Sequence, residues 1–264
     1  MSCIFSFSNQ KGGVGKTTTT INVGAYMAYL GKRVLMVDLD PQGNMSSGWK
    51  LSHQTHNVFS LLLGESKLDD SIISLDRAIN PHQGGHLSLI PCTSHFSRFE
   101  RLRSGEINAQ FDLKKVLRPI FDDFDIILLD CPPSLGLITL NAFSLSNFVF
   151  VPIEAHLFSM DGLDHMCNII KDVREFSNPG LAIGGIFFVK HDKRKILNRE
   201  IQSFIANTYK GLLLNTTIRE NIALKEAPHE GKDIFSYAPK SNGAKDYSSL
   251  TLEILNKFDG NTNG

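Results

Sequence analysis

The amino-acid sequence predicts an α/β fold with a doubly wound, mostly parallel sheet and helices on both faces. Short runs rich in β-branched and aromatic residues alternate with longer helical stretches, which is the pattern of strands joined by crossover helices. Several of these runs are almost wholly apolar, as strands covered on both faces must be. The 264 residues contain no long linker rich in proline, glycine or serine, so we expect a single domain covering residues 1–264.

The individual elements are predicted from composition, length and the turn-forming residues that bound them. The expected strands are 3–9, 33–38, 86–91, 125–130, 148–154 and 182–189. The expected helices are 17–30, 157–176 and 194–209. Gly31 gives the first helix its stop signal. The polar ending 259–264 is expected to fray.

Composition argues against several classes of protein. The 27 basic and 27 acidic residues cancel, so a nucleic acid or a membrane surface would need a local patch. The first residues lack a basic region followed by a long apolar run, and no 18 consecutive residues are apolar, so we expect a cytoplasmic protein. The four cysteines show no CxxC spacing and are expected to be reduced thiols in or near the core: Cys3, Cys92, Cys131 and Cys167.

The segment SNQKGGVGKTT (8–18) lies between the first predicted strand and the first predicted helix. It ends like a phosphate-binding loop, but Gln10 stands where the ordinary motif has its first glycine. Backbone N–H groups of such a loop, together with the helix N-terminus, would converge on the phosphates of ATP. Lys16 would neutralise the β- and γ-phosphates, and the Thr17 hydroxyl would ligate Mg2+. The expected nucleotide-binding residues of the loop are Gly12, Gly13, Val14, Gly15, Lys16, Thr17 and Thr18.

Aspartates at two strand ends are placed to complete such a site. Asp130 ends the apolar run IILLD and can emerge at the carboxyl edge of the sheet, where open α/β sheets bind ligands. It is the candidate metal anchor, acting through a metal-bound water, and the alternative is a simple strand-end cap. Asp38 and Asp40 end the strand RVLMVDLD, and alternation places them on the same side. Asp40, which lies in the following turn, is favoured as the residue that orients the attacking water.

Motifs spread over nearly the whole chain carry a family resemblance. They are KGGVGKTT (11–18), VDLDPQGN (37–44), LLDCPPSLGLITLNA (128–142) and EAPHEGKDIFSYAPKSNGAKDY (226–247). Together they resemble the deviant-Walker ATPases, and specifically the ParA/Soj-type plasmid and chromosome partition ATPases. The resemblance implies a phosphate-loop NTPase fold and a weak basal hydrolysis of ATP to ADP and phosphate.

The resemblance also implies roles for single residues. Lys11 would be the signature lysine, which reaches across an ATP-sandwich homodimer to the phosphates bound by the other subunit. A cation supplied in this way acts like an arginine finger and makes hydrolysis depend on dimerisation. Lys11, Lys16 and Asp40 would form the catalytic set. A bulkier side chain at Gly12 would block dimer closure, and Asn221 would contact adenine.

A local basic patch is the predicted DNA-binding region. Residues 190–245 contain eleven lysines and arginines against six acidic residues, an excess of five in a chain whose total is zero. The alternative is an ordinary solvated face. The resemblance favours nonspecific binding of double-stranded DNA by the ATP-bound dimer, although Glu220 and Ala223 stand where relatives carry arginines. The expected contacts are Lys193, Arg194, Arg219 and Lys225.

Partners and location follow from the same resemblance. Hydrolysis would be stimulated by a centromere-binding protein resembling ParB or Spo0J, and the ATP form would associate with the nucleoid. No membrane partner is expected, because SLTLEILNKFDGNTNG at the end of the sequence is not a basic amphipathic helix. The rival hypothesis is an ATP-dependent scaffold that positions a protein cargo without binding DNA. A metal or cofactor carrier is disfavoured because no cysteine pair is present.

Overall fold

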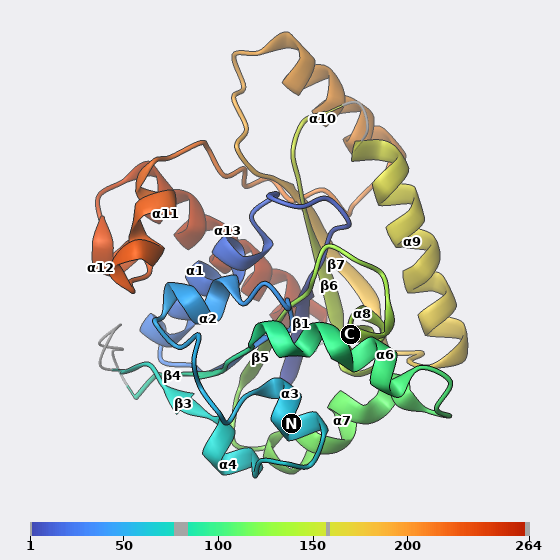
Figure 1. Ribbon diagram of the computed structural model, residues 1–264. Helices are drawn as coiled ribbons and strands as arrows, with labels where there is room; N and C mark the ends of the chain where they lie inside the picture. The colour runs from blue at the N-terminus through green and yellow to red at the C-terminus, as the bar shows by residue number, and fades with distance from the viewer. Residues whose placement is uncertain (1, 77–83, 157–158, 262–264) are drawn as a thin grey trace.

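The computed structural model describes residues 2–76, 84–156 and 159–261, with only the backbone at 159–160 and 259–261. Within these ranges the strands form one seven-stranded sheet in the order β3-β4-β2-β5-β1-β6-β7 (Figure 1). The strands are β1 Cys3–Phe7, β2 Arg33–Asp38, β3 Ile73–Ser74, β4 His86–Ile90, β5 Ile126–Asp130, β6 Phe148–Ile153 and β7 Ala182–Phe188. Neighbouring strands pair in parallel, except that β3 pairs antiparallel with β4.

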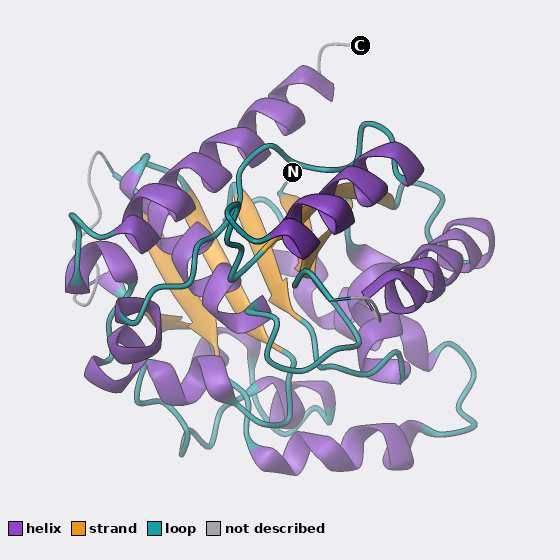
Figure 2. Cartoon of the chain, turned by 90° about the horizontal axis from the view of Figure 1, so that it is seen from above, coloured by secondary structure: helices purple, strands orange, loops and turns teal. Residues whose placement is uncertain are grey.

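The predicted fold class is confirmed, because the sheet is mostly parallel and helices cover both of its faces (Figure 2). The helices are α1 Lys16–Tyr29, α2 Asn44–Gly48, α3 Val58–Leu62, α4 Leu68–Ser71, α6 Phe99–Arg103, α7 Asp112–Leu117, α8 Leu137–Leu145, α9 Ser159–Phe176, α10 Ile196–Thr208, α11 Ala223–Glu226, α12 Ile234–Tyr237 and α13 Asn242–Asn261. Short 3-10 helices are η1 Ser94–Arg98, η2 Ala109–Phe111, η3 Arg118–Ile120 and η4 Ala227–Glu230.

The predicted strands and helices match the observed elements to within a few residues. Each of the six predicted strands overlaps an observed one, and α1, α9 and α10 overlap the three predicted helices. Residues 157–158 of the second predicted helix lie outside the described part of the chain. Strand β3 was not predicted, because its two residues are too few to show an alternating pattern.

Two apolar clusters lie on opposite faces of the sheet, and β5 contributes to both. Ile127 and Leu129 belong to one cluster, together with Phe143 of α8. Ile126 and Leu128 belong to the other, which α1 and α13 help to form. Successive side chains of a strand point to opposite faces. A strand buried on both faces therefore needs a continuous apolar run rather than an alternating one.

Helix α1 packs between the sheet and α13. A Cβ atom at Gly24 would lie 2.9 Å from Met36 Sδ and 3.2 Å from Leu128 Cδ1, so glycine is what allows α1 this close to β2 and β5. Towards α13, the Thr19 hydroxyl hydrogen-bonds the Tyr247 hydroxyl at 3.1 Å. This packing fixes the position of the first turn of α1, which follows the predicted phosphate loop.

Helix α13 was not predicted, although its apolar residues recur at helical spacing. Tyr247, Leu250 and Ile254 are spaced three and four residues apart and are all buried. The helix extends to Asn261, so it includes residues 259–261 of the segment 259–264 that was expected to fray. Residues 262–264 of that ending lie outside the described residues.

The strand order brings the candidate residues to one edge of the sheet. The chain passes from β1 to β2 across β5, and from β5 to β6 across β1, so the connections leave the sheet centre in opposite directions. Open parallel sheets bind ligands at the carboxyl ends of the strands at such a point. The register places Asp130 opposite both Phe7 and Asp38. The loop after β1 and the aspartates of β2 and β5 therefore meet at this edge.

Candidate nucleotide-binding site

The segment between β1 and α1 has the backbone geometry of a phosphate-binding loop. Gly13 and Gly15 both have φ of 75°, a left-handed conformation that strongly favours glycine. Val14, between them, is buried and anchors the loop in the apolar core. Gly15 precedes the first turn of α1, so the N–H groups of Lys16 and Thr17 lie at the positive end of a 14-residue helix.

Lys16 is buried inside the loop. Its side chain turns back so that Nζ donates to the carbonyl oxygens of Asn9, at 3.0 Å, and Lys11, at 3.2 Å. Burial lowers the pKa of Lys16, and the nearby Asp130 and Asp40 carboxylates oppose that change. An ammonium held on backbone carbonyls inside a loop of N–H donors is a suitable partner for a phosphate.

Asp38 and Asp40 have different surroundings although they are two residues apart. Asp38 is fully buried and accepts hydrogen bonds from Ser46 N at 2.9 Å, Ser46 Oγ at 2.6 Å and Asp40 N at 3.2 Å. Burial raises the pKa of Asp38 to about 6 in spite of these bonds. Asp40 lies in the next turn, where its Oδ1 accepts from Gln42 N at 2.9 Å. The Asp38 carboxylate is thus fixed by three hydrogen bonds inside the protein, while Asp40 lies in a turn at the sheet edge.

Asp130 is the buried carboxylate that the protein leaves unpaired. Both of its oxygens are inaccessible, and neither accepts a hydrogen bond of acceptable geometry from the residues that the structure describes. Burial and the neighbouring Asp38 raise the pKa of Asp130 well above its usual value, against the effects of Thr17 and Lys16. Buried polar atoms are normally paired, and exceptions have a functional or structural cause. The arrangement fits a residue that holds a water bound to a metal ion.

Lys11 lies at the rim of the loop with its side chain 46% exposed. Its ammonium faces Glu154, which directly follows β6, with 3.5 Å between Nζ and Oε2. Lys190, after β7, also contacts Glu154, at 2.6 Å. Sequence reasoning did not select Glu154 or Lys190. Glu154 is the last residue of one predicted strand and Lys190 directly follows another, and these positions at the edge where ligands bind could have indicated them.

Asn221 is placed at the start of α11. Its side-chain oxygen accepts from Ala223 N at 2.9 Å, which is the pattern of an Asx turn at the beginning of a helix. The side chain is partly exposed. Its contact with adenine stays a prediction.

The predicted DNA-binding residues are only partly brought together. Lys193, Arg194 and Arg219 line one groove of about 860 Å³, whereas Lys225 is not among its lining residues. Acidic side chains line the same groove. Arg194 is paired with Asp192, with 2.9 Å between Nε and Oδ1, and this pair holds the pKa of Asp192 down to about 2. The groove is therefore basic but partly neutralised.

Arg219 and Lys225 also have acidic partners. Arg219 donates three hydrogen bonds to the Asp246 carboxylate, one from its backbone N–H and two from its side chain, the shortest being 2.6 Å from Nη2 to Oδ1. Lys225 Nζ lies 3.2 Å from Glu220 Oε1, and both side chains are more than half exposed. An ion pair as exposed as Lys225–Glu220 contributes little and can exchange partners in water, so Lys225 remains available to a phosphate backbone at a small cost. The Asp246 side chain that holds Arg219 is only 10% exposed, so Arg219 is held more firmly.

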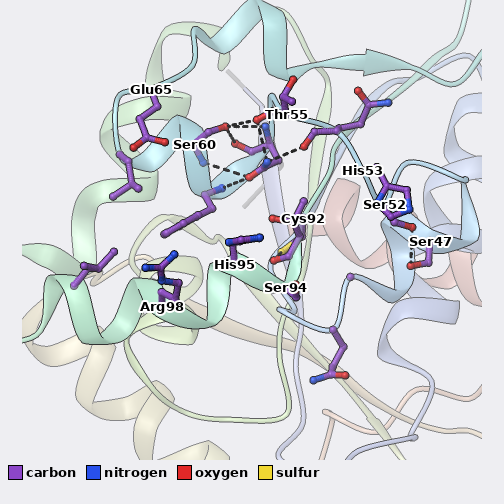
Figure 3. Close-up of a pocket in the computed structure, with 18 residues that line it drawn as sticks. Ser47, Ser52, His53, Thr55, Ser60, Glu65, Cys92, Ser94, His95 and Arg98 are labelled. Carbon is purple, nitrogen blue, oxygen red and sulfur yellow. Dashed lines mark hydrogen bonds between the residues drawn. The ribbon is translucent and has the colours of Figure 1, made fainter.

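A second hollow, of about 830 Å³, begins at the turn after Asp40 and extends to α3 and η1 (Figure 3). Gln42 and Gly43 line it on the side of the turn. Its polar lining includes the labelled side chains Thr55, Ser60, Ser94, His95 and Arg98. Ser46 links this hollow to the aspartates, because its hydroxyl donates to Asp38 and accepts from Cys92 N at 2.7 Å.

Fold and site together define a class of protein. The sheet is mostly parallel, and a glycine-rich loop that ends in Gly-Lys-Thr follows β1, a central strand. The paired strands β5 and β2, on one side of β1, both end in aspartates. The buried Lys16 and the second lysine at the rim, Lys11, complete the loop. This is an ATPase of the phosphate-loop class in which the first glycine of the loop is replaced.

Comparison with known proteins agrees with this class. A family model described as an AAA domain matches residues 2–183. The chromosome-partitioning ATPase Soj of Treponema pallidum is 41% identical over 94% of this chain and 95% of its own. The sporulation initiation inhibitor protein Soj of Bacillus subtilis is 36% identical over 96% and 98%. The structure of cobyrinic acid a,c-diamide synthase from Mycobacterium smegmatis, with bound ADP and magnesium, has a TM-score of 0.83 and 28% identity over 98% of this chain and 96% of that one.

The chain belongs to the Soj and ParA family of chromosome-partitioning ATPases. The resemblance seen in the sequence motifs is thereby confirmed. In the described ranges, no helix has both the length and the apolar character needed to cross a bilayer.

Proposed function

We propose that the protein is an Mg-ATP-dependent DNA partition ATPase that forms an ATP-sandwich homodimer, binds DNA nonspecifically in that state and is reset by partner-stimulated hydrolysis. One observation carries the proposal: Lys16, Thr17, Asp40 and Asp130 converge at one sheet edge, with Lys11 exposed at its rim. The solved relative that carries ADP and magnesium supports an adenine nucleotide with magnesium as the ligand of this site. The two Soj relatives support the process.

Nucleotide binding rests on the loop and on Asp130. Backbone N–H groups of 12–18 cradle the phosphates, and the Lys16 ammonium exchanges its two carbonyl partners for phosphate oxygens. The Thr17 hydroxyl ligates Mg2+, which neutralises charge on the transferred phosphoryl group. Asp130 fits the metal because its two buried oxygens accept no hydrogen bond of acceptable geometry in the described part of the chain and lie near Thr17, the predicted metal ligand.

Hydrolysis depends on two residues at the rim of the site. Asp40 orients the attacking water. Its turn is held by two hydrogen bonds, from Gln42 N to the Asp40 side chain and from Gly43 N to the Asp40 carbonyl oxygen. Lys11 reaches the phosphates bound by the other subunit and stabilises the charge that develops there. Turnover is slow in a single subunit because that cation comes from the partner.

DNA binding rests on the basic groove beside the site. Lys193, Arg194 and Arg219 contact the phosphate backbone of either strand without reading its bases. A dimer doubles this surface, and a centromere-binding partner resembling ParB or Spo0J would stimulate hydrolysis and release the DNA. The protein would be cytoplasmic and associated with the nucleoid in its ATP form.

An alternative function is favoured by the acidic residues of the groove. Arg194 and Arg219 are both paired with carboxylates, which weakens a phosphate-binding surface. In this alternative the ATP-bound dimer positions a protein cargo without contacting DNA. The two functions share the nucleotide cycle and differ only in what the dimer binds.

The deciding experiment measures binding to a random-sequence duplex with no nucleotide, with ADP and with a slowly hydrolysed ATP analogue, over a salt series. Binding that requires the analogue, falls with salt and is weakened by Arg194→Ala supports partition. The matched control is Arg174→Ala on α9, an exposed arginine outside the groove. If protein that is shown to dimerise binds no duplex, the cargo scaffold replaces the partition cycle.

A further inference from the structure

Glu154 connects two lysines that flank the phosphate loop. Its carboxylate contacts Lys190 through Oε1, at 2.6 Å, and Lys11 through Oε2, at 3.5 Å. His156 Nε2 lies 3.4 Å from the same Oε2 atom. The Glu154 side chain is 14% exposed, whereas the three basic side chains around it are more than two fifths exposed. A largely buried acid thus stands among more exposed basic side chains.

Lys190 fastens this acid to the loop. Its ammonium donates to the carbonyl oxygen of Gly13 at 2.7 Å as well as to Glu154. Its backbone has φ of 50°, which residues with a Cβ atom rarely adopt. Lys190 thereby ties the ends of β6 and β7 to the turn of the loop, and the position of Glu154 is set by these contacts.

The cluster keeps a negative charge beside Lys11. Burial opposes ionisation, but the contacts with Lys190 and Lys11 outweigh it and hold the pKa of Glu154 below its usual value. The carboxylate is therefore ionised at neutral pH. The phosphates of ATP carry more negative charge than one carboxylate that is already shared with Lys190, so they can compete for the Lys11 ammonium.

We infer that Glu154, fixed by Lys190, is a positioning residue that retains Lys11 on its own subunit and so opposes dimer closure until the partner's ATP competes for it. In this inference the Lys11 ammonium leaves Glu154 when it reaches phosphates bound by the other subunit, so the two contacts compete. The inference rests on the proposed role of Lys11 across the dimer. Glu154 sets how much ATP-bound protein dimerises and does not touch the reacting atoms.

The test is sedimentation equilibrium of the full chain with a slowly hydrolysed ATP analogue. For Glu154→Gln we expect the dimer dissociation constant to fall roughly 2- to 5-fold, the size of one exposed ion pair. The affinity of the monomer for ADP should not change, because ADP binding does not require Lys11 to move. Glu106→Gln, which removes a surface partner of Arg103, is the matched control and should alter neither quantity.

The same substitution in a Lys11→Ala background separates this inference from the proposed function. Without the Lys11 ammonium, Glu154→Gln should not change the dimer dissociation constant of the Lys11→Ala protein. An equal gain in both backgrounds, or no gain with Lys11 present, overturns the role of Glu154. If Lys11→Ala alone leaves both dimerisation and turnover at the unmodified level, the proposed function fails instead.

Discussion

Asp38 and Asp130 end two paired strands in register, and only Asp38 is paired by the protein. Asp38 accepts three hydrogen bonds, two of them from Ser46, whereas Asp130 accepts none of acceptable geometry in the described part of the chain. Both carboxyl groups have raised pKa values because both are buried. One aspartate therefore organises the turn after β2, and the other is left for a ligand.

Asp130→Asn should stabilise the folded chain while removing function. A carboxyl whose pKa is raised on folding favours the folded state while it is protonated, and this contribution is lost as pH rises through its folded pKa. The substitution removes the buried charge, so we expect a gain on the order of 1 kcal/mol at pH 8, or roughly 2–4 °C in Tm. Thermal unfolding at pH 8, compared with Mg2+-dependent ATP turnover, checks both parts.

Asp172→Asn, at an exposed position of α9, is the control and should leave Tm unchanged. The gain for Asp130→Asn should shrink below about pH 4, where an aspartate is largely protonated even in an unfolded chain. A Tm at pH 8 that is unchanged or lower would show that the Asp130 carboxylate is not costly to bury.

The stability that Asp38 contributes should fall between about pH 4 and pH 6. Asp38 has a folded pKa of about 6 against an ordinary value of 3.8, so its contribution is full at the lower pH and declines as pH rises through 6. Urea unfolding of Asp38→Asn and of the unmodified chain across this pH range measures the contribution of Asp38 to the free energy of unfolding. The difference between the two proteins should change with pH in that window, and a difference that is the same at pH 4 and at pH 6 would contradict the raised pKa of Asp38.

Ser46→Ala should destabilise the turn after β2. The hydroxyl donates to Asp38 and accepts from Cys92 N, so its loss removes one of the three hydrogen bonds to Asp38 and the bond that pairs the buried Cys92 N–H. We expect a loss of about 1–3 kcal/mol in the free energy of unfolding. Urea denaturation measures it, with Ser47→Ala, at an exposed neighbouring position, as the control. Equal stabilities of the two variants would contradict the linking role of Ser46.

Gly12→Val should leave the single chain stable and prevent dimerisation. A Cβ atom at Gly12 meets no atom within 4 Å, and Gly12 is not in the left-handed region. The unfolding free energy should therefore change by less than about 0.5 kcal/mol. Gly24→Val is the contrasting variant, because its Cβ overlaps Met36 and Leu128, and it should lose about 1–3 kcal/mol. Sedimentation with an ATP analogue then reports whether the Gly12 variant dimerises.

Lys16→Ala and Asp40→Ala should fail at different steps. Loss of the Lys16 ammonium should abolish nucleotide binding, because no other cation described lies on the carbonyls of Asn9 and Lys11. Asp40→Ala should retain binding and dimerisation while turnover falls by roughly 10²- to 10⁴-fold. Calorimetric ATP binding and phosphate release measure the two steps. Normal hydrolysis by Asp40→Ala would remove the water-orienting role from that residue.

The strands and the phosphate loop were predictable because their signals are local. Continuous apolar runs identified the buried strands, and the Gly-Lys-Thr ending between a predicted strand and a predicted helix identified the loop between β1 and α1. Helix α13 also carries a local signal, in the spacing of Tyr247, Leu250 and Ile254, which sequence reasoning did not use. Strand β3 carries no such signal, since pairing with β4 alone defines its two residues.

The residues that can meet at the sheet edge follow from the strand pattern of the chain, because parallel strands bring their carboxyl ends together. Their individual surroundings at that edge follow from contacts between distant segments. Asp38 and Asp130 look alike as strand-end aspartates, but Ser46 pairs one and burial isolates the other. Lys11 and Glu154 are 143 positions apart, and only folding of β1 beside β6 brings them into contact. Hydrogen bonds and ion pairs between distant segments leave no periodic trace in a sequence, which is why these roles appear only in the fold.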